Sequence, residues 1–91
     1  MKTGVELVAI ERQEQITKHG RTIEKDVAEN DNGELKWGAM SIITELIEDF
    51  PEQWQRSFWD KVIGKSQIEK LTIAGALICA EIDRLQAIQE N

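Results

Sequence analysis

Apolar residues recur along this chain with the spacing of amphipathic helices, and glycine and proline separate the segments that show this pattern. In residues 5–19, Val5, Val8 and Ile16 lie in one narrow stripe at 100° per residue, although Arg12 interrupts it. The pattern over residues 33–50 is more regular, and Pro51 follows that segment. Its expected apolar face consists of Leu35, Ala39, Ile42, Ile43, Leu46 and Phe50, and its expected polar face of Glu34, Ser41, Glu45 and Glu48.

Residues 66–89 form the longest predicted helix. Ser66 followed by Glu69 has the spacing of a capping box, which marks a helix start. The middle of this segment, residues 71–80, is apolar on all sides, so we expect the helix to be central or to lie between subunits. Its alanines and glycine are poor strand formers, which argues against a strand.

The segments between these helices are less regular. Residues 21–32 are polar and mixed, and we expect a loop there, with Asp31 or Asn32 capping the next helix. Residues 51–65 are expected to be irregular or to hold one short linker helix. The pattern therefore predicts one all-α domain over residues 1–91 with three long helices. So small a domain cannot readily bury an all-round apolar helix, and we expect a homodimer or a tetramer.

Composition narrows the choice of partners and compartment. Seventeen acidic residues against eleven basic ones give a formal charge of −6, which disfavours a nucleic-acid partner because phosphate binding needs clustered lysine and arginine. The longest apolar run is about half the length that a bilayer requires, so we expect no membrane partner. The single cysteine, Cys79, lies in an apolar run and cannot form an internal disulfide, which favours a cytoplasmic protein.

Three carboxylates occupy positions where the helical pattern favours an apolar residue. Glu81 has apolar residues one turn before it and one turn after it, and Glu11 lies at the border of the first apolar stripe. Glu34 begins the second helix, where Gly38 one turn later leaves space above it. Asp31 precedes Glu34 by three residues, so both carboxylates are expected on one side of the helix start.

Carboxylates that converge from separate helices are suited to Mg²⁺ or Mn²⁺, because these hard cations prefer oxygen ligands. Such a site can activate water for attack on phosphorus. The pattern equally allows a purely structural interpretation. Glu81 is then salt-bridged at a subunit interface, and Glu34 provides favourable charge near a helix N-terminus.

Three stretches of the chain, VELVAIERQEQI, DNGEL and LTIAGALICAEIDRLQ, resemble small phage and bacterial proteins related to the MazG-like nucleotide pyrophosphohydrolases. The resemblance covers most of the chain. It implies a MazG-like helical bundle completed by oligomerisation. It also implies Mg²⁺-dependent hydrolysis of a nucleoside triphosphate to the monophosphate and pyrophosphate. Lys25 and Val27 depart from the loop of many relatives, which carry groups able to bind metal or phosphate there.

By the same resemblance, the metal ligands are Glu11, Glu34 and Glu81, with Asp83 and Asp31 as further candidates. Glu34 is the expected catalytic base. The candidates for contacting substrate phosphate are Lys36, Arg12 and Arg84. A non-catalytic helical dimer that acts as a binding or assembly module is the alternative function.

Overall fold

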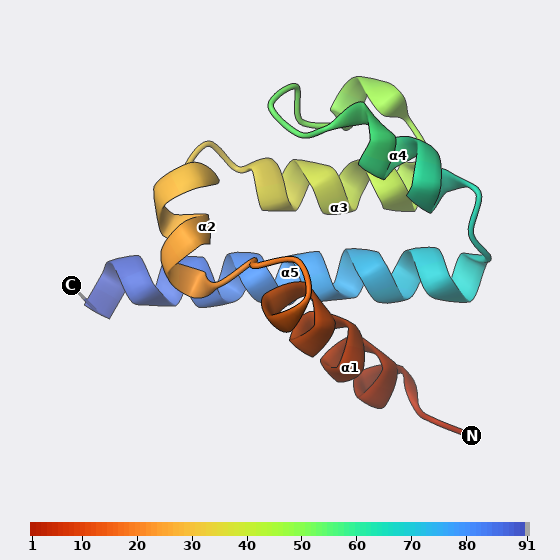
Figure 1. Cartoon of the computed structure of the whole chain (residues 1–91), viewed down its shortest axis with the longest axis horizontal. Helices are drawn as coiled ribbons and strands as arrows, with labels where there is room; N and C mark the ends of the chain where they lie inside the picture. The colour runs from red at the N-terminus through yellow and green to blue at the C-terminus, as the bar shows by residue number, and fades with distance from the viewer. Residues whose placement is uncertain (91) are drawn as a thin grey trace.

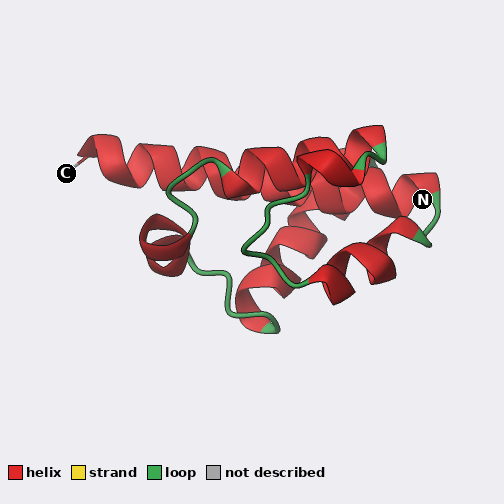
Figure 2. Ribbon diagram, turned by 90° about the horizontal axis from the view of Figure 1, so that it is seen from above, coloured by secondary structure: helices red, strands yellow, loops and turns green. Residues whose placement is uncertain are grey.

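The computed structural model describes residues 1–90, which form five α-helices and one short 3-10 helix. The elements are α1 (Gly4–Thr17), α2 (Ile23–Glu29), α3 (Glu34–Thr44), η1 (Ile47–Asp49), α4 (Arg56–Ile63) and α5 (Gln67–Glu90). Helix α3 lies along α5, α1 crosses α5 obliquely, and α2 packs on α5 near its C-terminal half (Figure 1). Within the described residues only helices and loops are present, so the all-α prediction is confirmed (Figure 2).

The three long helices begin where the apolar pattern predicts them, and the cap of α5 is confirmed. The Glu69 backbone N–H donates to Ser66 Oγ at 3.2 Å, and the Ser66 backbone N–H donates to Glu69 Oε1 at 3.4 Å. This reciprocal pair satisfies two of the donors that a helix N-terminus leaves free.

The loop predicted over residues 21–32 is wrong in its middle, because that segment contains α2. Gly20 adopts a left-handed conformation with φ 67°, which turns the chain, and Thr22 then caps the new helix by accepting the Lys25 N–H at 3.2 Å. Capping and tertiary packing on α5 stabilise this seven-residue helix, which is too short for a reliable periodic signal. Neither Asp31 nor Asn32 caps α3, whose N-cap residue is Gly33.

The helix predicted over residues 33–50 ends early, at Thr44. Glu45 follows with φ 61°, a left-handed conformation that is uncommon for a residue with a side chain. Its carboxylate binds the Lys70 ammonium of α5 at 2.8 Å and accepts a hydrogen bond from the Gln67 amide at 3.3 Å. These contacts with another helix favour the turn, after which the chain continues into η1 and then to α4.

The core lies between α3 and α5. It consists of Leu35, Ala39, Ile42, Val62, Ile73, Ala74, Leu77 and Ala80, with Trp54 and Phe58 packed against it. The small side chains along both helices allow the two backbones to approach closely.

The predicted faces of α3 are partly wrong. Ile43 and Leu46 are about half exposed, whereas Glu34 and Ser41, which were assigned to the polar face, are buried. Each buried polar group has a local partner: Glu34 Oε1 accepts the Asn32 N–H at 2.7 Å, and Ser41 Oγ donates to a backbone carbonyl at 2.7 Å. Local hydrogen bonds thus lower the cost of burying groups that the pattern places in solvent.

Helices α1 and α5 leave apolar side chains uncovered. In α1 the buried residues are Arg12 and Gln15, while Val5 is 82% exposed. In α5 an exposed row, called the α5 stripe below, follows the three- and four-residue spacing of a helix seam and consists of Ile68, Leu71, Ile78, Ile82 and Leu85. None of the helices in the described part of the chain is both long and apolar enough to cross a membrane.

Candidate functional site

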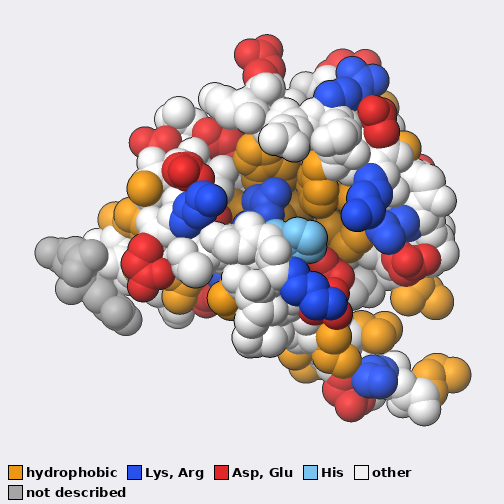
Figure 3. Space-filling model, viewed as in Figure 1, with side chains coloured by type: hydrophobic (Ala, Val, Ile, Leu, Met, Phe, Trp, Pro, Cys, Tyr) orange, Lys and Arg blue, Asp and Glu red, His pale blue; other side chains and the backbone are white. Residues whose placement is uncertain are grey.

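A cavity of about 800 Å³, called the main cavity, opens between α1, α2, α4 and the first half of α5. In the space-filling view it is a hollow with a hydrophobic floor and with Lys, Arg and His side chains around it (Figure 3). Its volume is in the range of cavities that hold small-molecule ligands, which combine an apolar lining with a few polar groups. The main cavity is therefore the candidate binding site.

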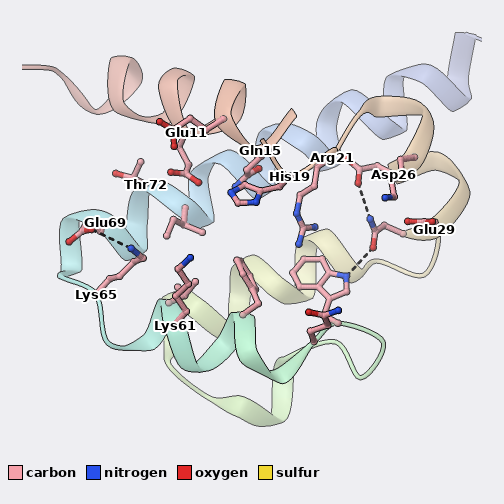
Figure 4. A pocket seen from close by; sticks show the side chains of 18 of the residues that line it. Glu11, Gln15, His19, Arg21, Asp26, Glu29, Lys61, Lys65, Glu69 and Thr72 are labelled. Atoms are coloured by element: carbon pink, nitrogen blue, oxygen red, sulfur yellow. Dashed lines mark hydrogen bonds and ion pairs between the residues drawn. The ribbon is translucent and has the colours of Figure 1, made fainter. Parts of the chain in front are cut away.

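Trp54 supplies an aromatic wall of the main cavity. Its ring makes an edge-to-face contact with Phe58 at 5.9 Å between centroids, and the Arg21 guanidinium carbon lies 4.7 Å from the Trp54 ring centroid. The indole N–H donates to Asn30 Oδ1 at 3.0 Å, and the Asn30 amide donates to Asp26 Oδ1 at 2.8 Å. This chain of contacts fixes the segment before α4 against α2 (Figure 4).

The same indole fills the space that the sequence analysis left open above Glu34. A Cβ atom placed on Gly38 would overlap the outer edge of the Trp54 ring. Because Gly38 has no side chain, the Trp54 ring can pack directly against α3 at this position. The space is therefore occupied by the indole and is not available to a metal ion bound at Glu34.

Charged side chains face one another across the main cavity. Glu11 of α1 and Lys61 of α4 lie on opposite sides of it (Figure 4). Neither side chain forms a hydrogen bond or an ion pair with residues 1–89, whereas Lys65 is paired with Glu69 at 3.7 Å. A carboxylate and an ammonium group thus remain available to a ligand.

Two buried residues that line the main cavity carry oxygen atoms without a hydrogen-bond partner among the described residues, Gln15 Oε1 and Asp26 Oδ2. Burial raises the pKa of Asp26, although the hydrogen bond from Asn30 and the charges of Arg12, Arg21 and Arg84 act in the opposite direction. Burial likewise lowers the pKa of Arg21, and the charge of Asp26 partly offsets this effect.

The predicted metal ligands lie in three separate places. Glu11 lines the main cavity, while Glu34 lines a smaller hollow of about 370 Å³ beside η1. On α5, both oxygens of Glu81 accept hydrogen bonds from Arg84 of the same helix, at 2.7 and 3.0 Å. Asp83 pairs with Arg12 at 3.4 Å, and Asp31 is exposed.

These residues do not fit a resident Mg²⁺ centre within one chain. Among the side chains of residues 1–89, no three His, Cys, Asp or Glu lie close enough together to hold a metal ion. Glu81, the clearest candidate in the sequence, already has both oxygens engaged by Arg84, in a pair that forms within one helix and not across a subunit interface.

The predicted phosphate contacts also lie away from the main cavity. Arg12 is buried and donates to the Arg21 carbonyl at 3.1 Å in addition to its pairing with Asp83. Lys36 lies over the Trp37 ring, with its ammonium 5.7 Å from the ring centroid. The cations that do line the main cavity, Arg21, Lys61 and Lys65 among them, were missed because nothing in their local sequence separates them from surface residues.

Comparisons with protein-family models, with curated proteins and with solved structures each gave no match. The resemblance to the MazG-like proteins therefore stays a prediction.

Proposed function

We propose that this protein is a Mg²⁺-dependent nucleoside triphosphate pyrophosphohydrolase whose substrate binds in the main cavity. The observation that carries the proposal is the combination of an aromatic wall, an unpaired lysine and an unpaired carboxylate around one hollow. A nucleotide needs a surface for its base and cations for its phosphates, and this cavity offers both.

In this proposal the base packs against Trp54 and Phe58, and the phosphates lie toward Lys61 and Lys65. Aromatic rings stack on any base, so this aromatic wall provides affinity but little base specificity. A phosphate that binds the Lys61 ammonium displaces no other group, because Lys61 forms no ion pair within the described residues.

The Mg²⁺ ion enters as part of the substrate, bound to the triphosphate. Mg²⁺ commonly binds through one or two carboxylates together with substrate phosphates and water, so a complete protein cage is not required. Glu11 is the predicted ligand that lines the main cavity, and Glu14 on the next turn lines it too. Hydrolysis forms a bond from a water oxygen to a phosphorus of the α–β anhydride and breaks the bond to the bridging oxygen. Glu11 accepts the proton.

Pyrophosphate release from each NTP and dNTP with Mg²⁺ tests the proposal. We expect Glu11→Gln and Lys61→Gln to lower turnover at least tenfold, and Lys36→Gln, a lysine outside the cavity, to leave it unchanged. Loss of turnover in Glu34→Gln but not in Glu11→Gln would indicate that hydrolysis takes place in the smaller hollow. No release from any nucleotide would end the enzymatic proposal.

The α5 stripe favours a second candidate, a helical homodimer that acts as a binding or assembly module. Helix α1 packs on the middle of this row, where Val8 lies against Gly75, and the exposed aliphatic side chains on either side of it are left for a second copy of the chain to cover. Light scattering after size exclusion measures the mass, and we expect a dimer or tetramer. Ile78→Glu should lower the measured mass toward that of a monomer. Ile43→Glu changes a similarly exposed aliphatic residue outside the stripe and should leave the mass unchanged. Association without pyrophosphate release supports this module, and a monomeric wild-type chain contradicts it.

A further inference from the structure

Arg84 binds Glu81, one of the carboxylates expected to hold a metal ion. Its side chain is 7% exposed, and that of Glu81 is 14% exposed. Two parallel N–H donors contact the two carboxylate oxygens at 2.7 and 3.0 Å, the fork geometry that makes arginine–carboxylate pairs strong.

Three further carboxylates from other parts of the fold act electrostatically on the same guanidinium. They are Asp31 in the loop before α3, Glu34 in the first turn of α3 and Asp26 of α2. The hydrogen bonds from Arg84 to Glu81, and then the charges of Glu81, Asp31 and Glu34, raise the pKa of Arg84, so the group stays positively charged.

We propose that Arg84 takes the place of a divalent cation at Glu81, so that this carboxylate binds no metal in the wild-type protein. The partly buried Glu81 carboxylate needs a counter-charge, and a guanidinium on the same helix supplies one without depending on ion concentration. A dication beside Arg84 would have to overcome its repulsion and compete for both oxygens of Glu81.

Removal of the guanidinium tests this assignment. Arg84→Met keeps a long apolar stem and deletes the charge. The matched variant is Arg12→Met, since Arg12 is as deeply buried and pairs with one carboxylate, Asp83. Both variants should have a lower Tm than the wild type. Only Arg84→Met should recover with Mn²⁺, by about 5–10 °C at ten times its Kd, because binding to the folded state stabilises it.

Mn²⁺ binding is measured directly by electron paramagnetic resonance, without nucleotide. We expect no stoichiometric Mn²⁺ in the wild type, one ion in Arg84→Met, and loss of that ion in the Arg84→Met/Glu81→Gln double variant. A wild-type protein that binds one Mn²⁺ and loses it in Glu81→Gln overturns the proposal, even if Arg84→Met does not fold. Equal Mn²⁺ recovery in the two arginine variants also overturns it. Because nucleotide is absent, these results are independent of the proposed hydrolase activity.

Discussion

The clearest test of the packing is Gly38→Ala, because intrinsic helix propensity and the structure predict opposite signs. In the interior of a solvated helix, alanine is more favourable than glycine by about 1 kcal/mol. Gly38 lies inside α3, so propensity alone predicts a more stable protein.

The structure predicts destabilisation, because a Cβ at position 38 would overlap two ring carbons of Trp54. The indole is a rigid ring, and a shift would weaken its hydrogen bond to Asn30 and its contact with Arg21. Overpacking of a core costs about 1–3 kcal/mol, a lost hydrogen bond about 1 kcal/mol, and a cation–π contact about 0.5–1 kcal/mol. After subtraction of the propensity gain of about 1 kcal/mol, Gly38→Ala should destabilise the fold by about 1.5–4 kcal/mol.

Urea denaturation of three alanine variants measures this effect against matched glycines. Gly4, at the start of α1, has nothing within 4 Å of an added Cβ, so Gly4→Ala should be neutral or slightly stabilising. At Gly75 in α5 the added Cβ would lie 2.9 Å from a Val8 methyl, and Val8 can move more easily than an indole. The expected order of stability is therefore Gly4→Ala, then Gly75→Ala, then Gly38→Ala. A Gly38→Ala protein as stable as the wild type would refute the packing of the Trp54 ring against Gly38.

Three further predictions concern caps and buried charges. Ser66→Ala removes the N-cap of α5 and should cost about 1 kcal/mol in urea denaturation; an unchanged midpoint would mean that the capping box contributes nothing. Burial raises the pKa of Asp26 above its ordinary value of 3.8. The protonated carboxyl group therefore contributes its full share to the free energy of unfolding below pH 3.8, and this contribution is lost as pH rises through the folded-state pKa. Relative to Asp26→Asn, the wild type should therefore lose stability as pH rises from 3.8 through the folded-state pKa, and a constant difference would contradict this sign. Glu45→Gln removes the carboxylate partner of the buried Lys70 and should lower Tm more than Glu48→Gln does, as thermal melts would show; equal Tm values would argue against the pair.

The sequence was most informative where a signal is local. The starts of the three long helices and the Ser66 cap depend on residues within a few turns of one another, and both predictions are confirmed. The end of α3 was missed because the turn at Glu45 depends on Lys70, which lies 25 residues away. Similarly, α2 owes its stability to a cap and to contacts with α5, and neither produces an apolar period.

The candidate site shows the same division between local and long-range signals. The pattern identified Glu81 as a carboxylate among apolar residues, and Arg84 at i+3 is visible in the sequence. Spacing cannot decide between an arginine and a metal as its partner, because both satisfy the same buried charge. Lys61 resembles an ordinary surface lysine until the fold places α4 and α1 around the same cavity.

The positions of the cations suggest a division of roles between them. Arg84 and Arg12 are buried, and each is paired with a carboxylate of α5, so neither can turn toward a ligand without leaving that carboxylate unpaired. The Lys61 side chain faces the main cavity without a partner among residues 1–89, so binding an anion there breaks no ion pair. Replacing a buried arginine should therefore change stability before it changes ligand binding, and replacing Lys61 should do the reverse.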